Sequence, residues 1–158
     1  MIMKVSKLLC AAILIVSISS CSKTVEKLID ETTTEDILAE KSPWVFSSYE
    51  NSFIEDDGGS GLSSEEINND MNRYLIGVNF TFNADRTGFL DVPEQGREDW
   101  VWTLGEDHLT TISESQTDQY TFFSADRNQM TFESRTTTMH TKDSVRYAVT
   151  HVGKYFFN

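Results

Sequence analysis

The stretch "RYLIGVNFTF", residues 73–82, decides the fold class that the sequence predicts. Its apolar residues Tyr74, Ile76, Val78, Phe80 and Phe82 alternate with other residue types. Side chains of a β-strand alternate between two faces, whereas those of a helix repeat about every 3.6 residues. The alternation therefore predicts a half-buried strand over the whole stretch.

Similar alternating runs, separated by turn residues, continue to the end of the chain. They are "WVFSSYE" (44–50), "FLDV" (89–92), "WVWTL" (100–104), "LTTIS" (109–113), "QYTFF" (119–123), "MTFESRTTT" (130–138) and "SVRYAVTHVGKYFF" (144–157). The pattern predicts an all-β domain of about eight short strands, with no helix between them. Meandering antiparallel strands of this number close most economically into a small up-and-down barrel, which leaves no exposed edge. A β-sandwich or a flattened barrel is the alternative.

The N-terminus has the pattern of an exported lipoprotein. Lys4 and Lys7 precede an apolar run, residues 8–18, which is shorter than the roughly 20 residues of a membrane-spanning helix and is typical of a signal peptide. The residues "ISS" before Cys21 resemble the lipobox of bacterial lipoproteins. That resemblance implies removal of residues 1–20 and lipid attachment to Cys21. The other cysteine, Cys10, falls inside the leader, so the mature chain has no pair for a disulfide.

The predicted organisation has three parts. After the signal peptide, residues 21–41 form the lipidated cysteine and a polar tether, with one helical turn starting near Thr34. Alternation begins at Trp44, so residues 42–158 are expected to form one barrel domain.

The charge of the chain excludes one class of partner. Its 13 Lys and Arg face 25 Asp and Glu, a formal net charge of −12. Loss of the two leader lysines would make this about −14, and a surface so acidic repels phosphates. Nucleic acid is therefore not an expected partner.

The series of aromatic strands resembles the lipocalin-like domain of small bacterial envelope lipoproteins. The resemblance rests on "PWVFSSYE", "FTFNADRTGFL", "WVWTL" and "YTFFSADRNQMTFES", and it covers most of residues 38–157. It implies an eight-stranded barrel that holds a small ligand. Lipocalins usually carry Gly two residues before the first-strand Trp, where this chain has Ser42.

No catalytic or metal-binding constellation is recognisable. Ser60 lacks the Gly-x-Ser-x-Gly spacing of a hydrolase, and the acidic loop of residues 55–66 lacks the glycine that an EF-hand requires at its sixth position. His108 and His140 are expected to be exposed, whereas His151 falls on the inward face of the last strand. We therefore expect a non-enzymatic protein without metal or cofactor.

Two functions remain. The first is a lipid-anchored barrel, expected at the outer membrane of a Gram-negative envelope, that binds a small apolar or amphipathic ligand. Its expected ligand-lining residues are Trp44, Phe46, Trp100, Trp102, Phe122, Tyr147 and His151. The second is a lipidated accessory of an envelope protein complex, with a filled barrel and outward contacts at Phe53, Phe123 and Phe156.

Overall fold

The structure, a computed structural model, describes residues 32–158. The predicted signal peptide, the lipidation site Cys21 and most of the predicted tether lie outside the described residues. The barrel belongs to a compact unit that spans Thr34–Asn158. Within residues 32–158, no helix has the length and apolar character needed to cross a membrane.

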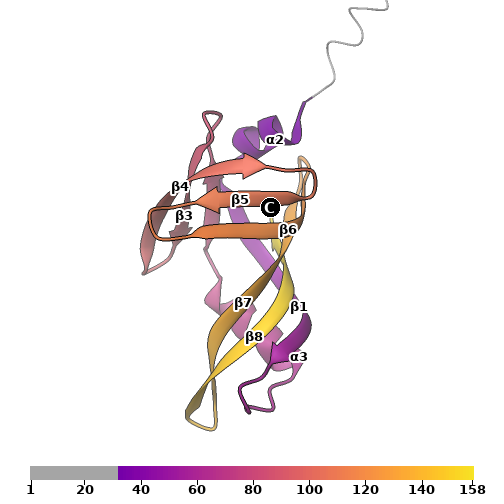
Figure 1. Cartoon of the computed structure of the whole chain (residues 1–158), viewed down its shortest axis with the longest axis vertical. Helices are drawn as coiled ribbons and strands as arrows, with labels where there is room; N and C mark the ends of the chain where they lie inside the picture. The colour runs from indigo at the N-terminus through magenta and orange to yellow at the C-terminus, as the bar shows by residue number, and fades with distance from the viewer. Residues whose placement is uncertain (1–31) are drawn as a thin grey trace, which may run out of the picture. The chain divides into compact units, whose positions relative to one another are not determined.

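Eight antiparallel strands close into a barrel in simple chain order, each paired with the next and β8 paired with β1 (Figure 1). The predicted up-and-down barrel is therefore confirmed, and the sandwich alternative is excluded. The strands are β1 Trp44–Asp56, β2 Asn79–Phe82, β3 Thr87–Val92, β4 Gly96–Leu104, β5 His108–Ile112, β6 Thr117–Ala125, β7 Met130–Lys142 and β8 Val145–Phe157.

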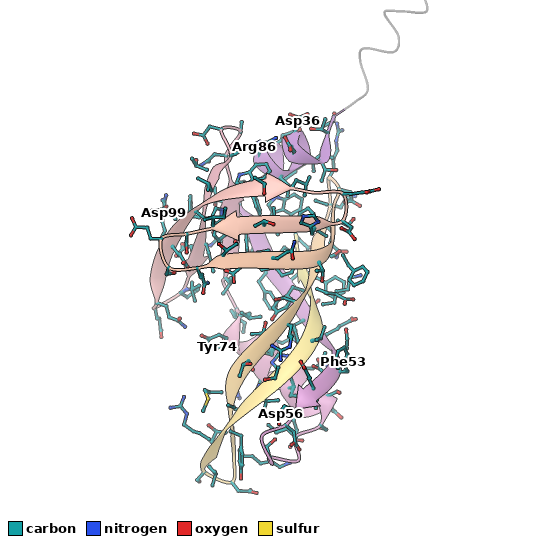
Figure 2. The ribbon with its side chains drawn as sticks, in the orientation of Figure 1. Asp36, Phe53, Asp56, Tyr74, Arg86 and Asp99 are labelled. Carbon is teal, nitrogen blue, oxygen red and sulfur yellow. The ribbon has the colours of Figure 1, made fainter. Side chains whose placement is uncertain are left out.

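A short helix, α2 (Thr34–Lys41), covers one end of the barrel, beside the β2–β3 turn (Figure 1). Leu38 is fully buried there, and its carbonyl accepts hydrogen bonds from the Trp44 indole (3.0 Å) and the Ser42 hydroxyl (2.8 Å). Arg86 of the β2–β3 turn pairs with Glu35 of α2 at 2.8 Å. Figure 2 shows Arg86 beside this helix. The helical start predicted near Thr34 is present, but α2 packs on the barrel unit and is not part of a free tether.

A second helix, α3 (Ser64–Tyr74), lies between the first two strands, where the sequence pattern predicts no helix. Ser63 and Glu66 form a reciprocal capping box, which satisfies backbone N–H groups at the helix start. Ile67 and Met71, four residues apart, bury one face of the helix.

The prediction of a strand over residues 73–82 is consequently wrong in its first half. Tyr74 ends α3, and Ile76 is largely exposed. Gly77 has a φ of +80°, a left-handed conformation that glycine adopts without steric cost, and the strand begins only at Asn79. The alternation of apolar residues thus spans a helix end, a turn and a short strand.

Beyond the barrel, the ends of three strands continue as a twisted ribbon, here called the extension (Figure 1). It consists of residues 134–142 of β7, 145–153 of β8 and 49–56 of β1, with β8 in the middle. In this region β1 would present a free edge, because its register with β2 covers only Trp44 and Val45.

Helix α3 covers that edge of β1 with two asparagine side chains. Asn72 accepts a hydrogen bond from the Tyr49 N–H (2.8 Å) and donates to the Tyr49 carbonyl (3.0 Å). Asn68, one turn earlier, accepts from the Asn51 N–H at 2.6 Å. The two amides replace a neighbouring strand and attach α3 to the extension.

The Asn72→Ala variant tests this attachment. It leaves the polar backbone of Tyr49 without its partners, so we expect the free energy of unfolding to fall by about 2 kcal/mol or more. Asn69→Ala is the matched control, because Asn69 lies exposed on the same helix and alanine favours helix. Urea unfolding monitored by tryptophan fluorescence measures both, and equal stabilities of the two variants would contradict the assignment.

Candidate functional site

The barrel encloses a cavity of about 460 Å³, here called the barrel pocket. It opens at the end where the β3–β4 and β5–β6 turns lie, since Gln95, Ser113 and Gln116 line it. Helix α2 covers the opposite end, beside the β2–β3 turn. The barrel is therefore closed at one end and accessible at the other.

Aromatic side chains form the interior wall of the barrel pocket. Phe80 lies near their centre, with ring centroids 5.1 Å from both Trp100 and Phe157 and 5.8 Å from Phe132. All four residues are buried. Edge-to-face and tilted contacts of this kind give a rigid apolar wall.

Two hydrogen-bond donors belong to this wall. The indole N–H of Trp100 is buried and has no partner among the described residues. Burial, followed by the charge of Asp118, raises the pKa of Tyr120, so its hydroxyl stays protonated. A buried donor without an acceptor is unfavourable. The Trp100 nitrogen lies against Gly88 of β3, 2.3 Å from where a Cβ of that residue would be, so this donor does not mark a polar contact for a ligand.

The mouth of the barrel pocket is acidic. Burial, followed by the charge of Glu98, raises the pKa of Asp118. Arg135 also lines the mouth, but its guanidinium is already bound to Glu55 at 2.5 Å. The electrostatics of the mouth therefore favour a cationic or uncharged group over an anion.

Of the seven residues expected to line a ligand site, only Trp100 lines the barrel pocket. Trp44 is buried but points its indole at α2, and the Trp102 indole donates to the Thr87 carbonyl at 3.0 Å. Phe46 packs edge-on against Phe157, with centroids 5.8 Å apart. These side chains are core residues at the closed end of the barrel.

The expectation that Phe122 faces inward is wrong: it is 68% exposed. The β6–β7 register shifts between Thr121 and Ser124, and Phe122 has a φ of +48°. Such a bulge reverses the side-chain alternation from that point. Phe123 is consequently buried, so the expectation that it points outward is wrong. Of the other two residues expected to point outward, Phe53 is exposed. Phe156 is half-buried beneath Lys154.

Several pocket residues were not among the expected ones. Phe80, Phe132 and Phe157 lie on the apolar faces of their strands, so alternation held a signal for them. The sequence did not indicate that Asp118 and Glu98 line a pocket, because polar residues near strand starts are common on barrel surfaces. Only the closed barrel brings these two carboxylates to one mouth.

A second cavity, of about 700 Å³, lies beside the extension and is here called the edge groove. It is bordered by Tyr74 and Thr137, which also line the barrel pocket, and Tyr74 lies where the barrel meets the extension (Figure 2). Its lining residues are Asp70, Met71, Arg73, Tyr74, Thr137, Thr138, Met139, His140, Thr141 and Arg146.

A chain of hydrogen bonds runs from the interior of the extension to this groove. Assigning the protons so that each donor meets an acceptor gives one direction. The Tyr49 hydroxyl donates to His151 Nδ1 (2.6 Å), and His151 Nε2 donates to the Thr138 hydroxyl (2.7 Å). The Thr138 hydroxyl donates to His140 Nε2 (2.7 Å), and His140 Nδ1 donates to Asp70 (3.0 Å). With this assignment, each imidazole nitrogen of the chain has a hydrogen-bond partner.

The two histidines differ from the sequence expectation in one respect. His151 is fully buried, as its inward alternation predicted, but His140 is also buried, whereas an exposed position was expected. Asp70 of α3 bonds to His140, and α3 is the helix that the sequence pattern did not reveal. Tyr147, the remaining expected ligand residue, is half-buried against the core and lines neither cavity.

Burial sets the protonation states inside this chain. It lowers the pKa of His151 from 6.5 to about 4, with the neighbouring His140 as the second cause. Burial also raises the pKa of Tyr49, with Tyr155 as the second cause. Both groups consequently stay neutral near neutral pH. The order carboxylate, imidazole, hydroxyl also occurs in hydrolase triads, but here the hydroxyl is held by a second imidazole.

The depressed pKa of His151 predicts a pH dependence of stability. The unfolded chain protonates His151 below about pH 6.5, and the folded chain only below about pH 4. The free energy of unfolding should therefore fall, by up to about 3 kcal/mol, as pH drops through this window. The His151 imidazole contacts Tyr49, Thr138 and His140, and Asp70 lies beyond His140. Because several of these neighbours can also titrate, the test is the difference between the wild-type and His151→Gln profiles.

Urea unfolding across this pH window measures that difference. The free energy of unfolding of His151→Gln should be lower than that of the wild type at neutral pH. It should also change less as the pH falls. His108→Gln is the matched control, because His108 is half-exposed beside Asp107 and should leave the wild-type slope intact. An unchanged slope in His151→Gln would contradict the assignment.

The chain matches no protein-family model, no curated protein and no solved structure.

Proposed function

We propose that this protein is a non-enzymatic envelope lipoprotein whose barrel binds a small amphipathic ligand. The observation that carries the proposal is the barrel pocket, with its aromatic wall and its polar mouth. An eight-stranded barrel either fills its interior with side chains or holds one small ligand. The volume of about 460 Å³ falls within the range of about 300–1,000 Å³ that is typical of small-molecule sites.

The pocket supports a particular orientation of the ligand. Its apolar end would lie against Phe80, Trp100 and Phe132, where contact with rings replaces contact with water. Its polar end would lie at the mouth, beside Asp118 and Glu98. A cationic head group fits these carboxylates better than a neutral one, and an anionic head group fits them least.

The N-terminal pattern supports an envelope location. Basic residues, a short apolar run, two serines and Cys21 occur in the order that lipidation requires. Acyl chains on Cys21 would hold the barrel at a membrane, and the Gram-negative outer membrane is the proposed one. The formal charge of −12 is consistent with a protein that does not bind nucleic acid.

The alternative function is a scaffold role within an envelope protein complex. The exposed aromatic rings of Phe53 and Phe122 favour it, since each is more than half accessible. The open barrel pocket favours ligand binding, because a scaffold has no need of an unfilled interior.

Titration with three ten-carbon amphiphiles tests the proposal. Decyltrimethylammonium, decanol and decanoate are added below their micelle concentrations while tryptophan fluorescence is recorded. We expect a saturable change with affinities in the order cation, alcohol, anion. Asp118→Asn should reduce the preference for the cation over the anion by about fivefold or more, which is about 1 kcal/mol.

Two variants of β4 locate the binding event. Trp100→Phe should remove most of the ligand-dependent fluorescence change, because Trp100 lines the barrel pocket. Trp102→Phe should retain it, because Trp102 lies two residues away in the closed end. If no amphiphile gives a saturable change, or if the change persists fully in Trp100→Phe, the barrel pocket is not the ligand site.

A further inference from the structure

The extension has one covered edge and one free edge. Asn68 and Asn72 of α3 cover the backbone of β1, as described above. On the other side, the β6–β7 register includes no residue of β7 beyond Glu133. Residues 134–142 of β7 thus pair only with β8, and no hydrogen bond from another part of residues 32–158 reaches their backbone on the outer side.

The edge groove runs along this free edge. Five consecutive residues of β7, 137–141, line it, although their side chains alternate between the two faces of the ribbon. Lining by residues from both faces fits a cavity at the outer edge of the strand, where the backbone N–H and C=O groups point. Asp70, Arg73 and Tyr74 of α3 form the opposite wall.

We propose that the free edge of β7, residues 137–141, binds an extended acidic peptide segment as an added β-strand. Unpaired strand edges are usually blocked by proline, bulges, inward charges or covering elements. Residues 134–142 contain no proline, and their pairing with β8 has no register shift. An added extended backbone supplies alternating donors and acceptors that match those of such an edge.

The groove walls favour acidic side chains on the partner. Arg73 and Arg146 line the groove in a chain whose net charge is −12. The Arg73 side chain is 79% exposed and shares its charge with Asp70, whereas Arg146 has no ion-pair partner among residues 32–158. The exposed side chains of Met139 and Tyr74 provide apolar contacts between the charges. A second copy of this chain is a poorer partner, because residues 137–141 of its own β7 contain no carboxylate that could pair with Arg73 and Arg146.

Amide hydrogen exchange measured by NMR on the purified protein tests the proposal. The probe is a blocked Thr-Glu repeat peptide of about eight residues, the length of an ordinary strand. Thr-Gln and Thr-Lys peptides of equal length are the comparisons. In the free protein, the β7 amides that face away from β8 should exchange fast. Saturation with the Thr-Glu peptide should slow them by about tenfold or more, with weaker binding of Thr-Gln and the weakest of Thr-Lys.

Two charge reversals give the matched pair of variants. Arg146→Glu should weaken binding of the Thr-Glu peptide by about fivefold or more, which is about 1 kcal/mol. Arg127→Glu should leave it unchanged, because Arg127 lies exposed in the β6–β7 turn and does not line the groove. Decyltrimethylammonium should leave exchange at residues 138–141 unchanged, which separates this site from the barrel pocket.

Three results would overturn the proposal. The first is absence of binding, or binding that leaves the β7 amides unprotected. The second is equal binding of the Thr-Glu and Thr-Lys peptides. The third is protection that appears without peptide and rises with protein concentration, since that would assign the edge to a second copy of the chain.

Discussion

The double pairing of β8 is the constraint on which the rest of the structure depends. β8 pairs with β7 along its whole length and with β1 from Thr150 to Phe157. One face of this strand is buried from the extension to the barrel interior, at Val149, His151, Gly153, Tyr155 and Phe157. Glycine is required within this series, because a Cβ at residue 153 would lie 2.0 Å from the Tyr49 hydroxyl oxygen.

The same face of β8 connects two chemically different interiors. In the barrel, Tyr155 and Phe157 stack on Phe132 at 5.1 and 5.5 Å, which makes an apolar wall. In the extension, His151 is held between Tyr49 and Thr138, which makes a polar interior. The edge groove lies where β6 no longer pairs with β7, beyond Glu133. The barrel pocket lies inside the barrel, between side chains of several strands.

Strand alternation predicts the fold class correctly, because most strands bury one face and turn residues separate them. It fails where local geometry interrupts it. Phe122 and Phe123 exchange faces at a bulge, and residues 73–78 alternate without forming a strand. The Ser63–Glu66 capping box and the buried pair Ile67 and Met71 were readable signals for α3 within an apparently loop-like stretch.

The candidate sites were less predictable than the fold. The alternation of apolar residues identifies side chains that point into the barrel. It does not show whether these side chains fill the interior or leave a cavity. Trp100 and Trp102 are equivalent in the sequence pattern, yet only the first lines the barrel pocket. His140 could not be placed from its own neighbours, because Asp70 comes from a helix far away in sequence. A site whose residues come from several strands of the barrel can be recognised only when the closed barrel places those strands together.

Native mass spectrometry tests the central claim, an occupied barrel pocket, most directly. The sample is a secreted form of residues 22–158, purified from its own host without detergent. We predict an extra mass that is lost on gentle activation. It should be absent from Leu90→Trp, which fills the barrel pocket, and present in Leu104→Trp, a substitution away from the pocket lining. A bare polypeptide mass for the wild type, or equal occupancy in both variants, would contradict the claim.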